Sequence, residues 1–183
     1  MKGFTRTETR FSLCGLNCAL CSMHLGGYCP GCGGGAGNQS CAIARCSLDH
    51  GGIPFCWECP EYPCSHYDGF DDADSFVPHR ARDIALAREL GTEVYLAQLE
   101  EKRLILEKLL SSYNDGRRKA LFTTAVYLLP LEQLRSVLSV LASQPELADR
   151  PIKDRALAAA ELLQAAARQQ GIGLKLMKKQ KGG

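Results

Sequence analysis

Apolar residues recur at helical spacing through most of the chain after residue 80, with charged residues between them. Gly91 separates two such segments, and Thr92 is a residue type that favours the start of a helix. The turn sequence Asn114-Asp115-Gly116 ends the second segment. Because the connections between segments are short, the pattern predicts an antiparallel bundle. Its helices are expected over residues 81–90, 92–112, 118–129, 130–143 and 152–169.

Residues 12–75 follow a different pattern, in which large apolar residues are few and are interrupted by glycine and proline. Residues 1–75 also hold 12 of the 18 glycines. A segment of this kind buries too little apolar surface to offset the conformational entropy that it loses on folding. It therefore needs another source of stability.

All ten cysteines lie in this same segment. They are Cys14, Cys18, Cys21, Cys29, Cys32, Cys41, Cys46, Cys56, Cys59 and Cys64. Three pairs are separated by two residues: Cys18/Cys21, Cys29/Cys32 and Cys56/Cys59. This spacing lets both sulfurs reach one ion at about 2.3 Å, and three such pairs in a short segment indicate metal ligation.

Structural zinc contributes about 10–16 kcal/mol of apparent binding free energy in zinc-finger peptides, more than the scattered apolar residues of this segment can supply. We therefore expect a small irregular metal-stapled cysteine-rich domain over residues 1–75, followed by an all-α antiparallel helical bundle over residues 76–183. The first domain is expected to be unfolded without its ions.

The N-terminal residues lack the apolar core of a signal peptide, and no apolar run reaches the roughly 18–20 residues that cross a bilayer. We therefore expect a cytoplasmic protein with no membrane partner. In a reducing compartment, cysteines are more often metal ligands than disulfides. A secreted disulfide scaffold is the alternative, and it would require an export signal.

The identity of the metal stays open at the level of sequence. All-sulfur ligation suits two or three Zn²⁺ ions, and it also suits one or two 4Fe–4S clusters. Cys14, Cys18 and Cys21 have the spacing of a radical-enzyme cluster, but the alternation of strands and helices that such enzymes need is missing. Order along the chain suggests one site from Cys14, Cys18, Cys21 and a later cysteine, and another from the Cys29/Cys32 and Cys56/Cys59 pairs, but interleaved groupings are equally allowed. Ligation by His24, His50 or His66 is also open.

The series CGLNCALC, CPGC, CAIARCSLDHGG and CWECPEYPC resembles a family of cysteine-rich prokaryotic proteins known as a domain of unknown function and often labelled zinc-binding. All ten cysteines fall on the family pattern, over about residues 12–70. One departure is Ala44-Arg45, where the pattern often has Ile-Arg. The resemblance implies zinc binding and assigns no activity.

Charge divides unevenly between the two expected domains. Residues 1–75 carry four Lys/Arg and eight Asp/Glu, a balance of −4, whereas residues 76–183 carry 18 and 12, a balance of +6. Arg117, Arg118 and Lys119 lie where a helix is expected to start, so they form a candidate anion-binding site. With no recognisable catalytic set of residues, the sequence favours a zinc-braced interaction module for a protein or nucleic acid over an enzyme. An iron–sulfur redox or electron-transfer protein is the alternative.

Overall fold

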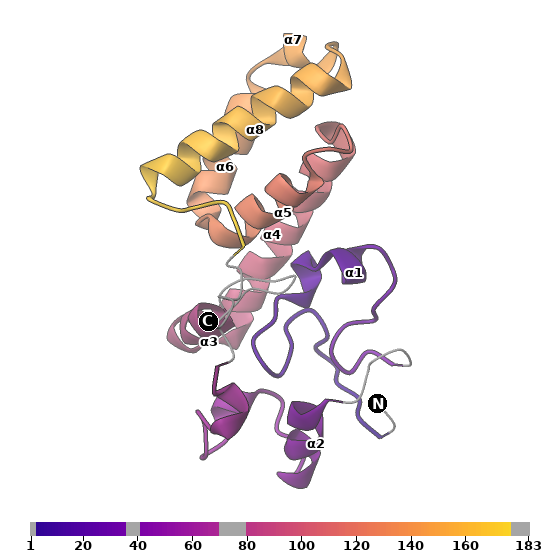
Figure 1. The fold of residues 1–183 in the computed structure, drawn as a ribbon, viewed down its shortest axis with the longest axis vertical. Helices are drawn as coiled ribbons and strands as arrows, with labels where there is room; N and C mark the ends of the chain where they lie inside the picture. The colour runs from indigo at the N-terminus through magenta and orange to yellow at the C-terminus, as the bar shows by residue number, and fades with distance from the viewer. Residues whose placement is uncertain (1–2, 36–40, 70–79, 177–183) are drawn as a thin grey trace, which may run out of the picture. The chain divides into compact units, whose positions relative to one another are not determined.

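The computed structural model describes residues 3–35, 41–69 and 80–176, and these form two compact units (Figure 1). Unit 1 contains the described residues up to Leu99, and unit 2 is Glu100–Leu176. Helix α4 (Thr92–Ser112) contributes its first part to unit 1 and the rest to unit 2. The expected domain boundary, between residues 75 and 76, lies outside the described residues.

The five helices predicted after residue 80 are confirmed. They are α3 (Arg80–Leu90), α4, α5 (Lys119–Leu128), α6 (Leu131–Ala142) and α8 (Ile152–Gln169). The sequence pattern did not predict the short helix α7 (Pro145–Ala148). Prolines immediately precede α6 and α8, where a fixed φ and a missing N–H suit the entry to a helix.

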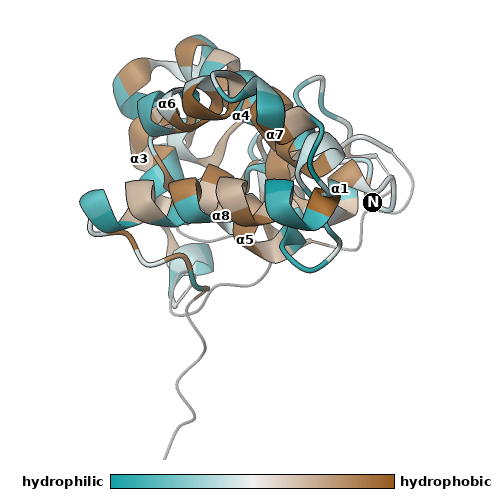
Figure 2. Ribbon diagram, turned by 90° about the horizontal axis from the view of Figure 1, so that it is seen from above, coloured by the Kyte–Doolittle hydropathy of each residue, from teal (hydrophilic) through white to brown (hydrophobic). Residues whose placement is uncertain are grey.

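Unit 2 is a bundle in which α8 packs against α5, α6 and α7. Along α8, buried small and apolar residues recur at helical spacing: Ala156, Ala159, Ala160, Leu163, Ala166 and Ala167. Small side chains let the neighbouring helices approach closely. Figure 2 shows the mixture of apolar and polar residues on each helix that such packing requires.

One ammonium group ties two helices of unit 2 together. The Lys102 side chain on α4 donates hydrogen bonds to the carbonyl oxygens of Tyr127, at 3.3 Å, and of Leu129, at 2.8 Å. The last carbonyl groups of a helix have no partner within the helix, so a cation at this position caps the C-terminus of α5.

Unit 1 contains the cysteine-rich segment and is largely irregular. Apart from α3 and the start of α4, the regular elements of unit 1 are α1 (Ser22–Leu25), α2 (Ala42–Asp49) and the 3-10 helices Cys18–Leu20, Cys56–Glu58 and Ser65–Tyr67. Within residues 3–35, 41–69 and 80–176, pairing between extended residues is limited to the bridge Phe11–Asn17. In the same ranges, none of the helices has both the length and the apolar composition of a membrane span.

An aromatic cluster forms the core of unit 1. The Phe55 and Trp57 rings stack with centroids 4.3 Å apart, and Phe11 lies 5.4 Å from Trp57. Tyr95, from α4, packs 4.7 Å from Phe11. The aromatic cluster of the cysteine-rich segment therefore includes a residue of α4, a helix that was expected to belong to the bundle alone.

A buried polar network joins the same partners. The Tyr95 hydroxyl donates to Asn17 Oδ1 at 2.9 Å, and Asn17 Nδ2 donates to Asp83 Oδ2 at 2.9 Å. All three residues are at most 5% exposed. Because buried polar groups are costly unless they are hydrogen-bonded, this network fixes the loop around Asn17 against α3 and α4.

Candidate metal centres

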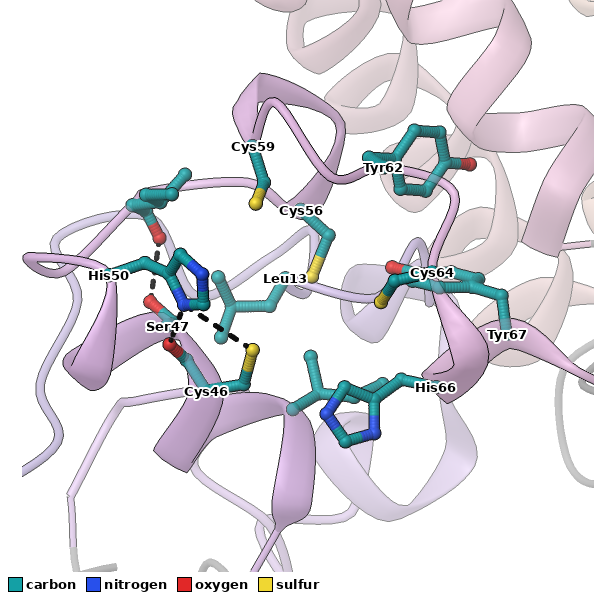
Figure 3. A pocket seen from close by; sticks show the side chains of 12 residues that line it. Leu13, Cys46, Ser47, His50, Cys56, Cys59, Tyr62, Cys64, His66 and Tyr67 are labelled. Atoms are coloured by element: carbon teal, nitrogen blue, oxygen red, sulfur yellow. Dashed lines mark hydrogen bonds between the residues drawn. The ribbon is translucent and has the colours of Figure 1, made fainter.

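Four cysteines from different parts of unit 1 line one small cavity (Figure 3). Cys46 lies on α2, Cys56 begins a 3-10 helix, Cys59 ends the same turn, and Cys64 precedes the next 3-10 helix. Figure 3 shows their sulfur atoms pointing toward a common central space. We call these four residues thiol cluster 1.

The backbone around thiol cluster 1 is held by local hydrogen bonds. The Cys59 N–H donates to the Cys56 carbonyl at 3.0 Å, which closes the tight turn expected from the Cys-x2-Cys spacing. The Ser47 hydroxyl donates to the Ile53 carbonyl at 2.8 Å, which ties α2 to the segment before Cys56. These contacts bring Cys46 to the Cys56/Cys59 turn.

The cavity has a volume of about 30 Å³, and Leu13, Ile43 and Ile53 contribute apolar side chains to its wall. A space of this size holds one small ion or one water molecule. Four thiols around one such space match the donor set of a structural tetrahedral zinc site. In the described part of the chain, however, no three Cys, His, Asp or Glu side chains already lie in the mutual positions of a coordination shell. Side-chain rotation would therefore have to accompany metal uptake.

Two histidines also line this cavity. His50 Nδ1 lies 2.9 Å from the Cys46 carbonyl, and its Nε2 lies 3.5 Å from Glu61 Oε1, so both ring nitrogens have protein partners. His66 lines the same cavity, whereas His24 lies elsewhere, with Nδ1 2.9 Å from the Cys29 carbonyl. His50 Nδ1 also lies 3.6 Å from the Cys46 sulfur, so His50 and His66 both belong to this site and His24 does not.

A second group of thiols lies around the loop that contains Asn17. Burial and, to a smaller extent, the charge of the neighbouring Cys32 thiolate raise the pKa of Cys18 to about 12. Burial likewise raises the pKa of Cys14, with further contributions from Cys32 and Cys41. Cys21 also lies close enough to Cys18 to influence its pKa. We call Cys14, Cys18, Cys21, Cys32 and Cys41 thiol cluster 2.

The loop that carries Cys14 and Cys18 is a compact turn. Ser12 N–H donates to the Leu16 carbonyl at 2.9 Å, and the Ser12 hydroxyl accepts from the Leu16 N–H at 2.7 Å. The same hydroxyl lies 3.3 Å from the Cys14 sulfur. The turn therefore carries the Cys14 and Cys18 thiols, and its Asn17 side chain takes part in the buried network with Asp83 and Tyr95.

One grouping suggested by the order of cysteines along the chain is a site shared by the Cys29/Cys32 and Cys56/Cys59 pairs. The structure instead places Cys32 beside Cys18 and Cys14, whereas Cys56 and Cys59 join Cys46 and Cys64. Burial raises the pKa of Cys56 to about 11, and Cys14 influences it as well, so the two clusters are neighbours within unit 1. Sequence reasoning identified the thiols but missed the residues that position one of their loops, Asn17, Asp83 and Tyr95. Nothing in the local sequence indicates a network whose members are 66 and 78 residues apart.

The basic turn of unit 2 has a partner of its own. The Arg118 guanidinium forms an ion pair with Asp115, and the Arg117 backbone N–H donates to Asp115 Oδ1 at 3.0 Å. These contacts hold the pKa of Asp115 below its usual value despite its desolvation. Arg117 and Lys119 are exposed. Part of the positive charge of this candidate anion site is therefore already neutralised.

Comparisons with known protein families, curated proteins and solved structures found no match to this chain. The two thiol clusters are therefore the features of the chain that point to a function.

Proposed function

We propose that unit 1 is a structural metal-binding unit that holds two Zn²⁺ ions, one in each thiol cluster. The observation that carries the proposal is the convergence of Cys46, Cys56, Cys59 and Cys64 on one cavity of ion size. These four thiols come from three separate turns, and a bound ion would cross-link them at the cost of displacing their protons.

Thiol cluster 2 supports the second ion. Cys14, Cys18 and Cys32 influence one another electrostatically and supply three ligands, with Cys21 or Cys41 as the fourth. Neighbouring thiolates repel one another, which raises the pKa of each thiol. A divalent cation bound between them would offset this repulsion. The resemblance to a family labelled zinc-binding agrees with this assignment.

The role of the metal is architectural, and the unit serves as an interaction module for a protein or a nucleic acid. Tyr28 is 79% exposed and Met23 is 42% exposed. The Tyr28 N–H donates to the Met23 carbonyl at 2.9 Å, so the two large side chains belong to one turn beside thiol cluster 2. An exposed aromatic residue on a rigid loop is a common anchor in protein interfaces.

Metal analysis of the full chain, purified without oxygen, tests the proposal. We expect two zinc ions per chain, one fewer in Cys56→Ser, one fewer in Cys18→Ser, and none in the double variant. Cys29→Ser is the matched control, because Cys29 belongs to neither thiol cluster, and it should retain both ions.

Two outcomes would contradict the zinc assignment. Protein that contains neither zinc nor iron would exclude metal binding by the thiols. Protein that contains iron and inorganic sulfide, with visible absorbance that bleaches on reduction, would replace zinc with the iron–sulfur alternative.

A further inference from the structure

Unit 2 contains a second, larger cavity at the end of α4, of about 450 Å³. Its walls come from the last turns of α4, from α6 and α7, and from Arg155 on α8. Figure 1 shows α6, α7 and α8 in the same part of the bundle. Small-molecule sites have volumes of about 300–1,000 Å³, so this cavity is large enough for an organic ligand.

Arg155 is the unusual residue of this cavity. Its Nε is buried, and within the described chain that atom has no hydrogen-bond partner. The residue as a whole is only partly exposed. A buried donor of a charged group is unfavourable without an acceptor, and no acceptor on the described chain satisfies this one, so the guanidinium is open to an acceptor that a ligand supplies.

The charge of the cavity lining is positive. Lys108 lines the same cavity as Arg155, and none of the described residues that line it carries a carboxylate. Ser112, Tyr113 and Gln144 add side chains that can donate hydrogen bonds. These groups favour an anion.

The remainder of the wall is apolar. Leu138 and Leu141 on α6 and Leu147 on α7 contribute aliphatic side chains, so a bare inorganic anion would leave much of the cavity unused. An organic acid would place its carboxylate on the arginine fork and its hydrocarbon part on the leucines. Arginine matches a carboxylate geometrically because two parallel N–H groups meet its two oxygens.

We propose that this cavity binds a small organic carboxylate with an aliphatic or aromatic body, with Arg155 as its main anchor and Lys108 as a second cation. This site is separate from the thiol clusters and from the basic turn at Arg118, whose guanidinium is already paired with Asp115. Ligand binding at unit 2 is therefore an additional property of the chain.

Isothermal titration of the full chain with octanoate tests the proposal, with octanamide and inorganic phosphate as comparison probes. Octanoate should bind. Octanamide lacks the carboxylate and phosphate lacks the hydrocarbon chain, so each should bind at least about tenfold more weakly than octanoate. Arg155→Met should weaken octanoate binding about tenfold or more, and Lys108→Met about threefold.

Arg168→Met is the matched control, because Arg168 lies on the same helix with its side chain exposed. It should change the affinity by less than about twofold. Arg155→Met removes an unpaired buried donor, so its melting temperature without octanoate should equal or exceed that of the wild type. If it fails to fold, Arg155→Lys replaces it and should also weaken binding, because lysine lacks the planar fork. Absence of octanoate binding, equal binding of octanamide, or unchanged affinity in the Arg155 variant would each overturn the proposal.

Discussion

Gly15 offers a direct test of how the cysteine-rich loop packs on α3. Its φ is +86°, and a Cβ at this position would lie 2.5 Å from Cγ1 and 2.7 Å from Cδ1 of Ile84. The Arg80 carbonyl oxygen would lie 3.1 Å away. Gly15→Ala therefore combines an unfavourable backbone conformation with a steric clash against a buried side chain.

The two effects can be given separate magnitudes. A left-handed backbone costs a non-glycine residue about 1–2 kcal/mol, and overpacking of a filled core costs about 1–3 kcal/mol. Gly15→Ala should therefore lower the free energy of unfolding by about 2–5 kcal/mol. Gly91 provides the matched control, because its φ is +82° and no described atom lies within 4 Å of the added Cβ. Gly91→Ala should show only the backbone cost, about 1–2 kcal/mol.

The chain contains one tryptophan, Trp57, and it stacks on Phe55 in the core of unit 1. Its fluorescence in a urea titration therefore reports the unfolding of this unit. Ile84→Ala should relieve part of the clash, so the loss in the double variant with Gly15→Ala should be smaller than the sum of the two single losses. Equal losses for Gly15→Ala and Gly91→Ala, or strict additivity with Ile84→Ala, would refute the packing argument.

Three further predictions concern the metal sites and the network beside them. A strong chelator should remove the bound metal and shift the Trp57 emission to that of the unfolded chain, while most of the helical circular dichroism persists; an unchanged Trp57 spectrum after complete metal removal would contradict this. Tyr95→Phe deletes the hydrogen bond to Asn17 and should lower the free energy of unfolding by about 0.5–1.5 kcal/mol, measured by the same fluorescence titration; no loss would show that the network adds nothing. Zinc affinity should fall as pH falls, by about tenfold per pH unit for each proton displaced, because Cys18 and Cys56 hold their protons to pKa values of about 12 and about 11. Competition titrations with a chelator of known zinc affinity, repeated at several pH values, measure this dependence, and a zinc affinity that stays constant as pH falls would contradict it.

The helices after residue 80 could be predicted because the information for each helix is local. Apolar residues recur at helical spacing, and residues such as Gly91, Pro130 and Pro151 mark the boundaries. The short helix α7 was missed because four residues are too few for a periodic pattern to be recognised.

The grouping of the cysteines into two thiol clusters, in contrast, could not be predicted from local sequence. The residue types predict metal ligation, but the grouping depends on where separate turns meet in space. Cys32 influences the pKa values of Cys14 and Cys18, although it is 18 and 14 residues from them in sequence. Spacing alone is compatible with several groupings of ten thiols, so only the fold distinguishes them.

The aromatic core changes the physical interpretation of the cysteine-rich segment. Taken alone, residues 12–75 contain too little apolar surface to fold without metal. Tyr95 and Ile84, which come from α4 and α3, contribute buried surface to that segment, and Asp83 completes a polar network with Asn17. Part of the loop between Cys14 and Cys18 is therefore positioned by contacts that involve no thiol. A loop that is already ordered loses less conformational entropy when it binds an ion, so the two sites should differ in how much folding accompanies metal uptake. In thiol cluster 1, Cys56 is likewise held, because Phe55 and Trp57 on either side of it belong to the aromatic cluster and its N–H donates to the Leu13 carbonyl at 3.2 Å. Cys46 and Cys64 lie on separate elements, so we expect their ordering to account for most of the folding that accompanies metal uptake at this site.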